Sequence, residues 1–379
     1  MDTSVTLANW RTPPYSAQSF HNVDKLVPVA RIKASDKVWT LTKDPLPLDG
    51  LVFNDQLGEE RRLSEVLAST DTRGLVVLQR GRMVAEWYGG GYDGASPHII
   101  YSVSKSLTGA LTGVLVETGQ LDPDSPVTKY IPEVDGSAYG DCLVRHVLDM
   151  TVSSSFVEEY VDLSGEYGRY RRATLWNPPL PGEEPVTLHD MLVTLSPGSV
   201  PHGQVFKYLS PNSDLLGWLV ERASGKKFAD LFSELVWKPL GAEADAYITV
   251  DVEGSPRAAG GICLLPRDLA RFGEMMRLGG KGILPAGWIE DICSNGDSAA
   301  WQKGDFANLF PNGRYRSKWY QTGLASGAYC AIGIHGQWLW IDPSREVVIA
   351  KVSNQPDPEN DDIDLMLIHA FDTIAEAVS

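Results

Sequence analysis

The chain has 379 residues, of which 43% are hydrophobic and 22% are charged, the balance of an ordinary globular protein with a sizeable core. Its formal net charge is −16. A surface this acidic repels phosphate backbones and anionic headgroups, so we expect no nucleic-acid partner and no membrane binding.

Targeting signals and metal motifs are both missing from the sequence. No run of 18 or more apolar residues occurs, and residues 1–6 lack the basic start and apolar stretch of a secretory signal, so we expect a cytoplasmic protein. The four cysteines lie far apart and form no C-x-x-C pair, which argues against disulfides and zinc. The histidines show no H-E-x-x-H spacing, and we expect no metal and no cofactor.

The first hundred residues predict a wrap followed by a hairpin. Residues 1–60 are rich in Pro, Trp and Asp with little periodicity, and we interpret them as an extended N-terminal wrap. Two apolar runs, 74–79 and 83–88, surround a Gly-containing turn and predict an antiparallel hairpin. Apolar residues at helical spacing then predict a helix over 102–118, which is apolar on most faces and so runs through the interior.

The middle of the chain predicts helices separated by long loops. A Pro- and Arg-rich stretch over 165–186 is one such loop, of a length that often covers a binding site. The helices are expected at 143–151, 187–195, 213–224 and 227–237.

The last third of the chain predicts strands again. A helix over 266–278 is followed by two strands, 331–341 and 346–352, joined by a Pro-containing hairpin turn. A closing helix covers roughly 362–377.

This order predicts an α+β fold, with one antiparallel sheet built from both chain ends, flanked by helices, and a mostly helical domain inserted between them. We expect residues 1–100 to form the wrap and the first part of the α/β domain. Residues 101–255 would form the helical domain, and residues 256–379 the second part of the α/β domain.

The sharpest chemical feature is Ser102-Val103-Ser104-Lys105, at the start of the predicted buried helix. A step of three residues places Ser102 and Lys105 on one helix face, with Cβ atoms about 5–6 Å apart. A serine hydroxyl needs an adjacent base to become a nucleophile, and a buried lysine with a lowered pKa can be that base. Most S-x-x-K pairs are instead a helix cap and a solvated lysine, but a lysine in an apolar helix needs an explanation.

Two further segments carry candidate chemistry. Tyr208 precedes a predicted helix and could move a proton between the serine, the lysine and a leaving group, although a core aromatic is the plainer reading. The strand containing Gly333 and Gly336 permits close approach of a substrate backbone, with a bulge or a tight sheet edge as the alternative.

Several blocks in the same order resemble the serine β-lactamase and penicillin-binding-protein superfamily, which uses S-x-x-K by mechanism. Within it the chain is most similar to the 6-aminohexanoate-dimer hydrolases, which degrade nylon oligomers, and to family VIII carboxylesterases. The blocks that carry the resemblance are Trp10-Arg11-Thr12-Pro13-Pro14, Ser102-Val103-Ser104-Lys105-Ser106-Leu107, Val147-Leu148-Asp149-Met150, Tyr160-Val161-Asp162, Arg267-Asp268-Leu269-Ala270-Arg271 and Gly333-Ile334-His335-Gly336-Gln337.

The resemblance implies a role for each motif residue. Ser102 would be the nucleophile, Lys105 the residue that activates it, and Tyr208 the third member that handles the proton. The oxyanion hole would consist of the backbone N–H groups of Ser102 and Ile334. An alternative register would replace Ile334 with Trp338.

The resemblance also implies substrate contacts. Tyr160 resembles a tyrosine that contacts the substrate amide, and His335 follows the oxyanion residue. Three positions depart from the family: Arg171 stands where a carboxylate can favour a substrate amino group, Ala259 where an Asn occurs, and Tyr320 where a Trp occurs. These departures put activity on nylon oligomers in doubt more than the acylation chemistry.

We therefore expect a serine hydrolase that cleaves amide or ester bonds of small linear acyl compounds through an acyl-enzyme on Ser102. The alternatives are a carboxylesterase or β-lactamase with little activity on nylon oligomers, and a non-catalytic sensor with the same fold. A metal-dependent hydrolase and an α/β-hydrolase lack their motifs, H-E-x-x-H and G-x-S-x-G. The sequence leaves room for a homodimer.

Overall fold

The computed structural model describes residues 4–160 and 164–379, and Val161 and Asp162 of the blocks named above lie outside these ranges. Within the described ranges the strands form a large sheet, a small sheet and a separate hairpin. The large sheet has the strand order β10 (Arg314–Arg316), β11 (Trp319–Gln321), β12 (Tyr329–Gly333), β13 (Gln337–Asp342), β14 (Val347–Ser353), β5 (Thr72–Gln79), β6 (Arg82–Tyr88) and β2 (Thr42–Lys43).

The large sheet unites both ends of the chain, as the sequence predicts. β14 pairs antiparallel with β5, so that Ile349 lies opposite Val77 at the centre of the sheet. The predicted hairpin forms between β5 and β6, also antiparallel. One pair departs from the expected antiparallel sheet, because β2 runs parallel to β6 at the edge.

The predicted strand over 331–341 is wrong. This segment forms two strands, β12 and β13, which pair antiparallel around a tight turn at residues 334–336. Two successive left-handed residues make the turn, His335 with φ 62° and Gly336 with φ 80°. Residues of high strand propensity on both sides concealed the break, and Gly333 and Gly336 were its sequence signals.

The small sheet joins the N-terminal wrap to the middle of the chain. The wrap thus contributes a strand and is not merely extended. The strands, in order across the sheet, are β1 (Val29–Ile32), β8 (Ala246–Thr249), β9 (Ile262–Leu264) and β7 (His98–Ile99). The separate hairpin consists of β3 (Val52–Asn54) and β4 (Glu60–Arg62).

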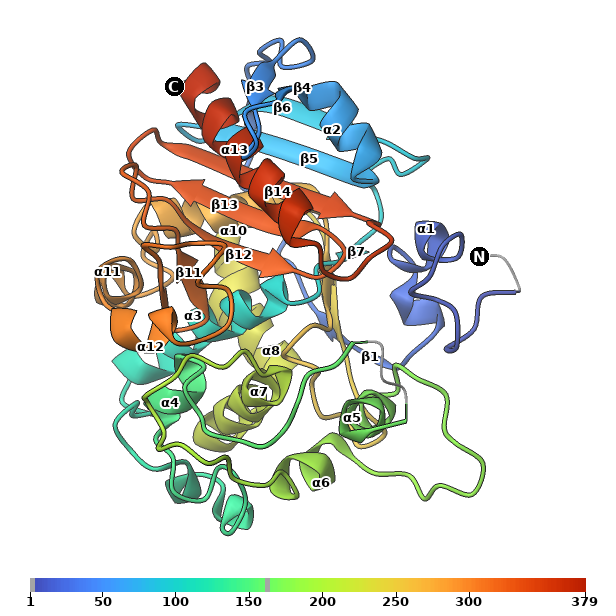
Figure 1. Ribbon diagram of the computed structural model, residues 1–379, viewed down its shortest axis with the longest axis vertical. Helices are drawn as coiled ribbons and strands as arrows, with labels where there is room; N and C mark the ends of the chain where they lie inside the picture. Colours follow the sequence, from blue (N-terminus) through green and yellow to red (C-terminus); the bar gives the residue numbers. More distant parts are fainter. Residues whose placement is uncertain (1–3, 161–163) are drawn as a thin grey trace.

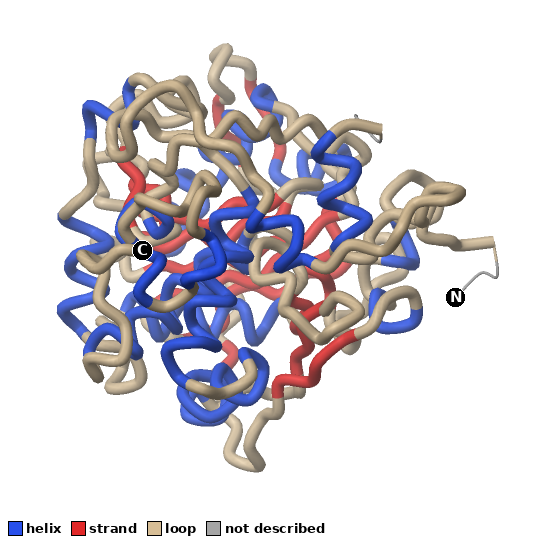
Figure 2. The backbone as a smooth tube through the Cα atoms, turned by 90° about the horizontal axis from the view of Figure 1, so that it is seen from below, coloured by secondary structure: helices blue, strands red, loops and turns tan. Residues whose placement is uncertain are grey.

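Helices cover both faces of the large sheet (Figure 1). The C-terminal helix α13 (Asp361–Val378) and α2 (Leu63–Ser69) pack on one face, and α10 (Pro266–Arg277) packs on the other. Each face has its own apolar core, because residues of β5 and β14 alternate between the two hydrophobic clusters. Viewed from below, the strands run through the middle of the molecule with helices around them (Figure 2).

The helical middle of the chain packs around α3 (Val103–Glu117), which contacts α7 (Ser210–Ser224). The predicted helices here are present: α4 and α6 are shorter than expected, α7 begins earlier, and the helix over 227–237 forms as α8 followed by a π-helix at Ser233–Trp237. α5 adds a helix inside the stretch we expected to be a loop. The remaining helices are α1 (Ser16–Ser19), α4 (Val144–Leu148), α5 (Glu166–Ala173), α6 (Leu188–Val193), α8 (Phe228–Phe232), α9 (Lys238–Leu240), α11 (Ala286–Ser294) and α12 (Ser298–Gln302).

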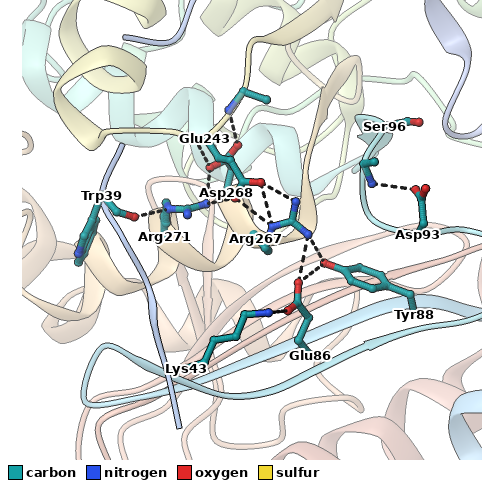
Figure 3. A network of polar contacts seen from close by, with 12 residues as sticks. Trp39, Lys43, Glu86, Tyr88, Asp93, Ser96, Glu243, Arg267, Asp268 and Arg271 are labelled. Atoms are coloured by element: carbon teal, nitrogen blue, oxygen red, sulfur yellow. Dashed lines mark hydrogen bonds and ion pairs between the residues drawn. The ribbon is translucent and has the colours of Figure 1, made fainter. Parts of the chain in front are cut away.

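A network of charged side chains connects the N-terminal strands β2 and β6 to α10 (Figure 3). Arg267 donates to Glu243 at 2.6 Å and to Glu86 of β6 at 3.1 Å. Lys43 of β2 pairs with the same Glu86 at 2.8 Å, and Arg271 holds the N-terminal segment through a backbone carbonyl. This network gives the Arg267-to-Arg271 block a structural role.

In the part of the chain that the structure describes, no helix combines the length and the apolar composition needed to span a bilayer.

Candidate active site

Ser102 lies at the N-cap of α3, and its side chain does not cap the helix. β7 pairs with β9, and the Ile100 amide donates to the Ile262 carbonyl at 3.0 Å, which fixes the chain just before the helix. Tyr101 then adopts a left-handed conformation with φ 41°. Ser102 is therefore held at a sharp turn, and 8% of the residue is exposed.

The Lys105 amine lies against this hydroxyl. Lys105 Nζ is 2.7 Å from Ser102 Oγ and donates to the Ala259 carbonyl at 2.8 Å. Lys105 is 1% exposed, because α3 is buried on almost every face. Burial lowers its pKa from 10.5 to about 7, and the negative charge of Glu158 opposes that change. A large share of this amine is therefore uncharged near neutral pH and able to accept a proton.

The Ala259 carbonyl is itself held in place by a buried ion pair. The Ala259 amide donates to Asp214 Oδ1 at 2.8 Å, and Asp214 pairs with Arg257 and accepts from the Tyr170 hydroxyl. Burial raises the pKa of Asp214, which the charge of Arg257 counteracts. Asp214 is on α7, so this helix fixes the acceptor that orients the Lys105 amine.

Tyr208 completes the group from the segment before α7. Its ring centroid is 4.9 Å from Lys105 Nζ, and Ser102 is close enough to lower the pKa of its hydroxyl. The Tyr208 amide donates to Asp305 Oδ2 at 2.8 Å, which anchors the segment. Burial, and then the charge of Glu158, raises the pKa of Tyr208 well above 10, so the phenol keeps its proton and can donate it.

The turn between β12 and β13 lies beside the start of α3. A Cβ added to Gly333 would be 2.7 Å from the Ile100 oxygen and 3.0 Å from the Ser102 nitrogen, so only glycine allows this approach. Within the described ranges, the backbone N–H groups of Ser102 and Ile334 donate to no other residue. Two free amides at this junction are the arrangement that a developing oxyanion requires.

The carbonyls of the same turn are all occupied. Gln337 Nε2 lies 3.3 Å from the Ile334 oxygen and 2.8 Å from the His335 oxygen. Lys351 Nζ donates to the Gly336 oxygen at 3.1 Å. Trp338 of the alternative register lies inside β13, paired with both neighbouring strands, so the geometry favours Ile334.

A cavity opens beside the turn, lined by Tyr160, Tyr208, Tyr320 and Ile334. Its rim is acidic, with Glu359, Asp361 and Asp364 among the lining residues. An adjoining groove is lined by three acids, Glu158, Asp305 and Glu359, and by one cation, Lys207, whose amine donates to the Ser154 and Phe156 carbonyls. Burial, then the neighbouring carboxylates, raises the pKa of Glu359 to about 7.

Three of the predicted substrate-contacting residues have other surroundings. Arg171 is buried behind Tyr160, donates to the Tyr160 carbonyl at 2.9 Å and stacks on Tyr167. The His335 ring packs in an aromatic cluster. The backbone carbonyl of Ala259 accepts a hydrogen bond from Lys105. Of the five predicted contacts, Tyr160 and Tyr320 are those that line the described cavity.

The sequence predicted only that the segment containing Glu158 could line the mouth of the pocket or be a solvated loop, and the structure shows that Glu158 connects several parts of the site. Its carboxylate accepts from the Tyr160 hydroxyl at 2.8 Å and from the Ser210 hydroxyl and amide at 2.6 Å each. Its charge acts on the pKa of both Lys105 and Tyr208. The adjacent Glu159 has the same chemistry, so nothing in the sequence distinguishes the two.

The fold and this arrangement define the class of protein: it is a serine hydrolase. The chain belongs to the Beta-lactamase family, whose model matches residues 60–372. It is 37% identical to the 6-aminohexanoate-dimer hydrolase of Paenarthrobacter ureafaciens, over 93% of this chain and 89% of that protein.

Solved structures agree with this assignment. A Bacillus anthracis protein, provisionally named a 6-aminohexanoate-dimer hydrolase, matches with a TM-score of 0.91 and 26% identity, over 100% of this chain and 98% of that chain. A family VIII carboxylesterase matches with a TM-score of 0.58 and 16% identity, over 81% of this chain and 96% of that chain. The second likeness concerns the fold alone.

Proposed function

We propose that the protein hydrolyses amide and ester bonds of small linear acyl compounds through an acyl-enzyme on Ser102. One observation carries the proposal: a fully buried amine with a pKa of about 7 lies 2.7 Å from the Ser102 hydroxyl. An uncharged lysine at that distance is the base that a serine nucleophile needs.

The proposed acylation uses three proton transfers. Lys105 takes the Ser102 proton as Oγ attacks the acyl carbon, and the amides of Ser102 and Ile334 bind the oxyanion that forms. Tyr208 gives its proton to the leaving nitrogen or oxygen as the bond to the acyl carbon breaks, and the Lys105 ammonium returns a proton to Tyr208. Water then attacks the acyl-enzyme by the same route in reverse and releases the acid.

The acidic rim supports a substrate that carries a positive charge. The cavity beside the turn presents Glu359, Asp361 and Asp364, and the adjoining groove adds Glu158. Burial raises the pKa of Glu359 and of Asp364 to about 7, so these two acids are partly ionised at neutral pH, and together with Glu158 and Asp361 they attract an ammonium group and disfavour an anionic one. The Paenarthrobacter relative is named for an amine-bearing amide, the 6-aminohexanoate dimer, and we propose the same substrate class here.

The departures at Arg171, Ala259 and Tyr320 support a second candidate, a carboxylesterase with little activity on the dimer. Arg171 is the main reason, because the resemblance places a carboxylate that favours a substrate amine at this position, and this chain has a cation there, hydrogen-bonded to the Tyr160 carbonyl. We expect p-nitrophenyl esters to react faster than amides of the same acid in either case, since nitrophenolate is a better leaving group than an amine.

The four cysteines are free thiols, and three of them are buried. Free thiols suit a reducing compartment, which supports our expectation of a cytoplasmic location.

A matched pair of esters tests both parts of the proposal. We expect p-nitrophenyl 6-aminohexanoate to have a higher kcat/KM than p-nitrophenyl hexanoate, and the advantage to shrink as salt is added. Activity on both esters should disappear in Ser102→Ala. Ser104→Ala removes another buried serine two residues away and is the control, which should keep activity. Equal rates for wild type and Ser102→Ala would overturn the serine mechanism. A preference for the uncharged ester would overturn the cationic substrate alone.

A further inference from the structure

The residues next to the two proposed oxyanion donors share an unusual backbone conformation. Tyr101 precedes Ser102 and has φ 41°, and His335 follows Ile334 and has φ 62°. L-residues rarely adopt this left-handed region, so the surrounding structure must hold them there. Tyr101 directly precedes the peptide group that carries the Ser102 N–H, and His335 lies in the tight turn that holds the Ile334 N–H, so both conformations help to place the two donors.

The Tyr101 and His335 side chains meet in one aromatic cluster. Their ring centroids are 5.2 Å apart. The Tyr101 hydroxyl is buried and has no hydrogen-bond partner among the described residues, so ring contacts hold this side chain. The His335 ring is tied by Nδ1, which lies 2.8 Å from the Gln355 oxygen.

Phe20 contacts both of these rings from the N-terminal segment. Its ring centroid is 5.1 Å from that of Tyr101 and 5.2 Å from that of His335, in edge-on geometry. Phe20 is fully buried. Phe20 thus connects the N-terminal wrap to the residue before Ser102 and to the residue after Ile334.

The position of Phe20 is itself fixed by the backbone and by a second ring. Its carbonyl accepts from the Ile99 amide at 2.8 Å, which ties it to β7 just before the nucleophile turn. Trp10 packs edge-on against Phe20 at 6.1 Å and stacks on Tyr101 at 6.5 Å. Figure 1 shows the α1 segment beside β7 at this end of the molecule.

Resting on the proposed function, we propose that Phe20 is a positioning residue for the oxyanion hole, which sets the spacing of the Ser102 and Ile334 amides by wedging against Tyr101 and His335. Phe20 touches no reacting atom. Residues 4–32 precede the stretch that the family model matches, so this segment supplies the core fold with a support for its active site. Removing the wedge should let the two left-handed turns relax and misalign the donors.

Kinetics of Phe20 variants test this inference. We expect Phe20→Ala to lower kcat for p-nitrophenyl 6-aminohexanoate by about tenfold or more while KM changes less than threefold, because loss of one oxyanion donor costs about 10²- to 10³-fold. The rate of phosphonylation by a fluorophosphonate should fall by a similar factor, since that adduct also places an oxygen in the hole. Phe20→Leu keeps most of the volume, and we expect a loss of about threefold.

Phe228→Ala is the matched control, because Phe228 is equally buried but packs against Phe232 in the helical region. It should lower the melting temperature as Phe20→Ala does and leave kcat within twofold of wild type. Equal kcat losses in both Ala variants, or wild-type kcat in folded Phe20→Ala, would overturn the positioning role. If Phe20→Ala does not fold, wild-type kcat in Phe20→Leu would overturn it. An inactive wild type would instead count against the proposed function.

Discussion

Replacing Lys105 with methionine should abolish activity and stabilise the protein. Methionine fills a similar volume without a charge, and its side chain suits an apolar helix. The lysine pKa falls from 10.5 to about 7 on folding because the amine is buried. A shift of that size is on the order of 5 kcal/mol against the charged form.

The direction in which wild-type stability changes with pH follows from proton binding. Between pH 7 and 10.5 the unfolded chain holds the Lys105 proton and the folded protein has lost it, so wild-type stability rises with pH through this window. Below pH 7 the full cost of the buried amine is present. By pH 9 it has fallen to about 2 kcal/mol. Lys105→Met removes this cost and loses two hydrogen bonds, at about 1 kcal/mol each.

We therefore expect Lys105→Met to be more stable than wild type by about 2 kcal/mol at pH 7, and to show little or no gain at pH 9. Urea unfolding at the two pH values measures this difference. Lys226→Met, at a half-exposed lysine on the surface, is the control and should show no such dependence on pH. A Lys105→Met variant that is less stable than wild type by the same amount at both pH values would refute the reasoning.

Three other predictions concern the same site and its framework. The kcat/KM of wild type should rise about tenfold per pH unit up to pH 7 and then level, because only uncharged Lys105 is active; a flat profile down to pH 5 would contradict this. Tyr208→Phe should lower the rate on an anilide by about 10²-fold and the rate on a p-nitrophenyl ester far less, since nitrophenolate leaves without a proton. Equal losses would contradict the proposed proton donor. Asp268→Ala should cost about 3 kcal/mol in urea unfolding, because a buried carboxylate that binds Arg271 and two backbone amides is lost; less than 1 kcal/mol would contradict this.

Local rules were enough to predict that the Ser102 and Lys105 side chains meet. Ser102 and Lys105 are three residues apart on one helix, so helix geometry alone brings them together. The apolar composition of that helix also predicts the buried surroundings that lower the lysine pKa. The class of fold followed from the order of strand pair, helices and strands.

Contacts between distant segments were beyond such rules. Phe20 and His335 lie more than three hundred positions apart, and neither has a local pattern that distinguishes it from a core residue. The turn at His335 broke a run of good strand formers, and tertiary packing against Phe20 and Tyr101 accounts for the left-handed backbone that the run does not predict. Arg171, which the resemblance suggested as a substrate contact, is buried and donates to the Tyr160 carbonyl, a contact between segments that no local pattern predicts.

The central claim is that one serine hydroxyl carries the acyl group. Treating the protein with a fluorophosphonate and mapping the adduct by peptide mass spectrometry tests it directly. We predict a single phosphonyl group per chain, on Ser102, with labelling that slows below pH 7 as Lys105 takes up a proton. A protein that hydrolyses esters while Ser102 stays unmodified, or that is labelled at another residue, would contradict the account.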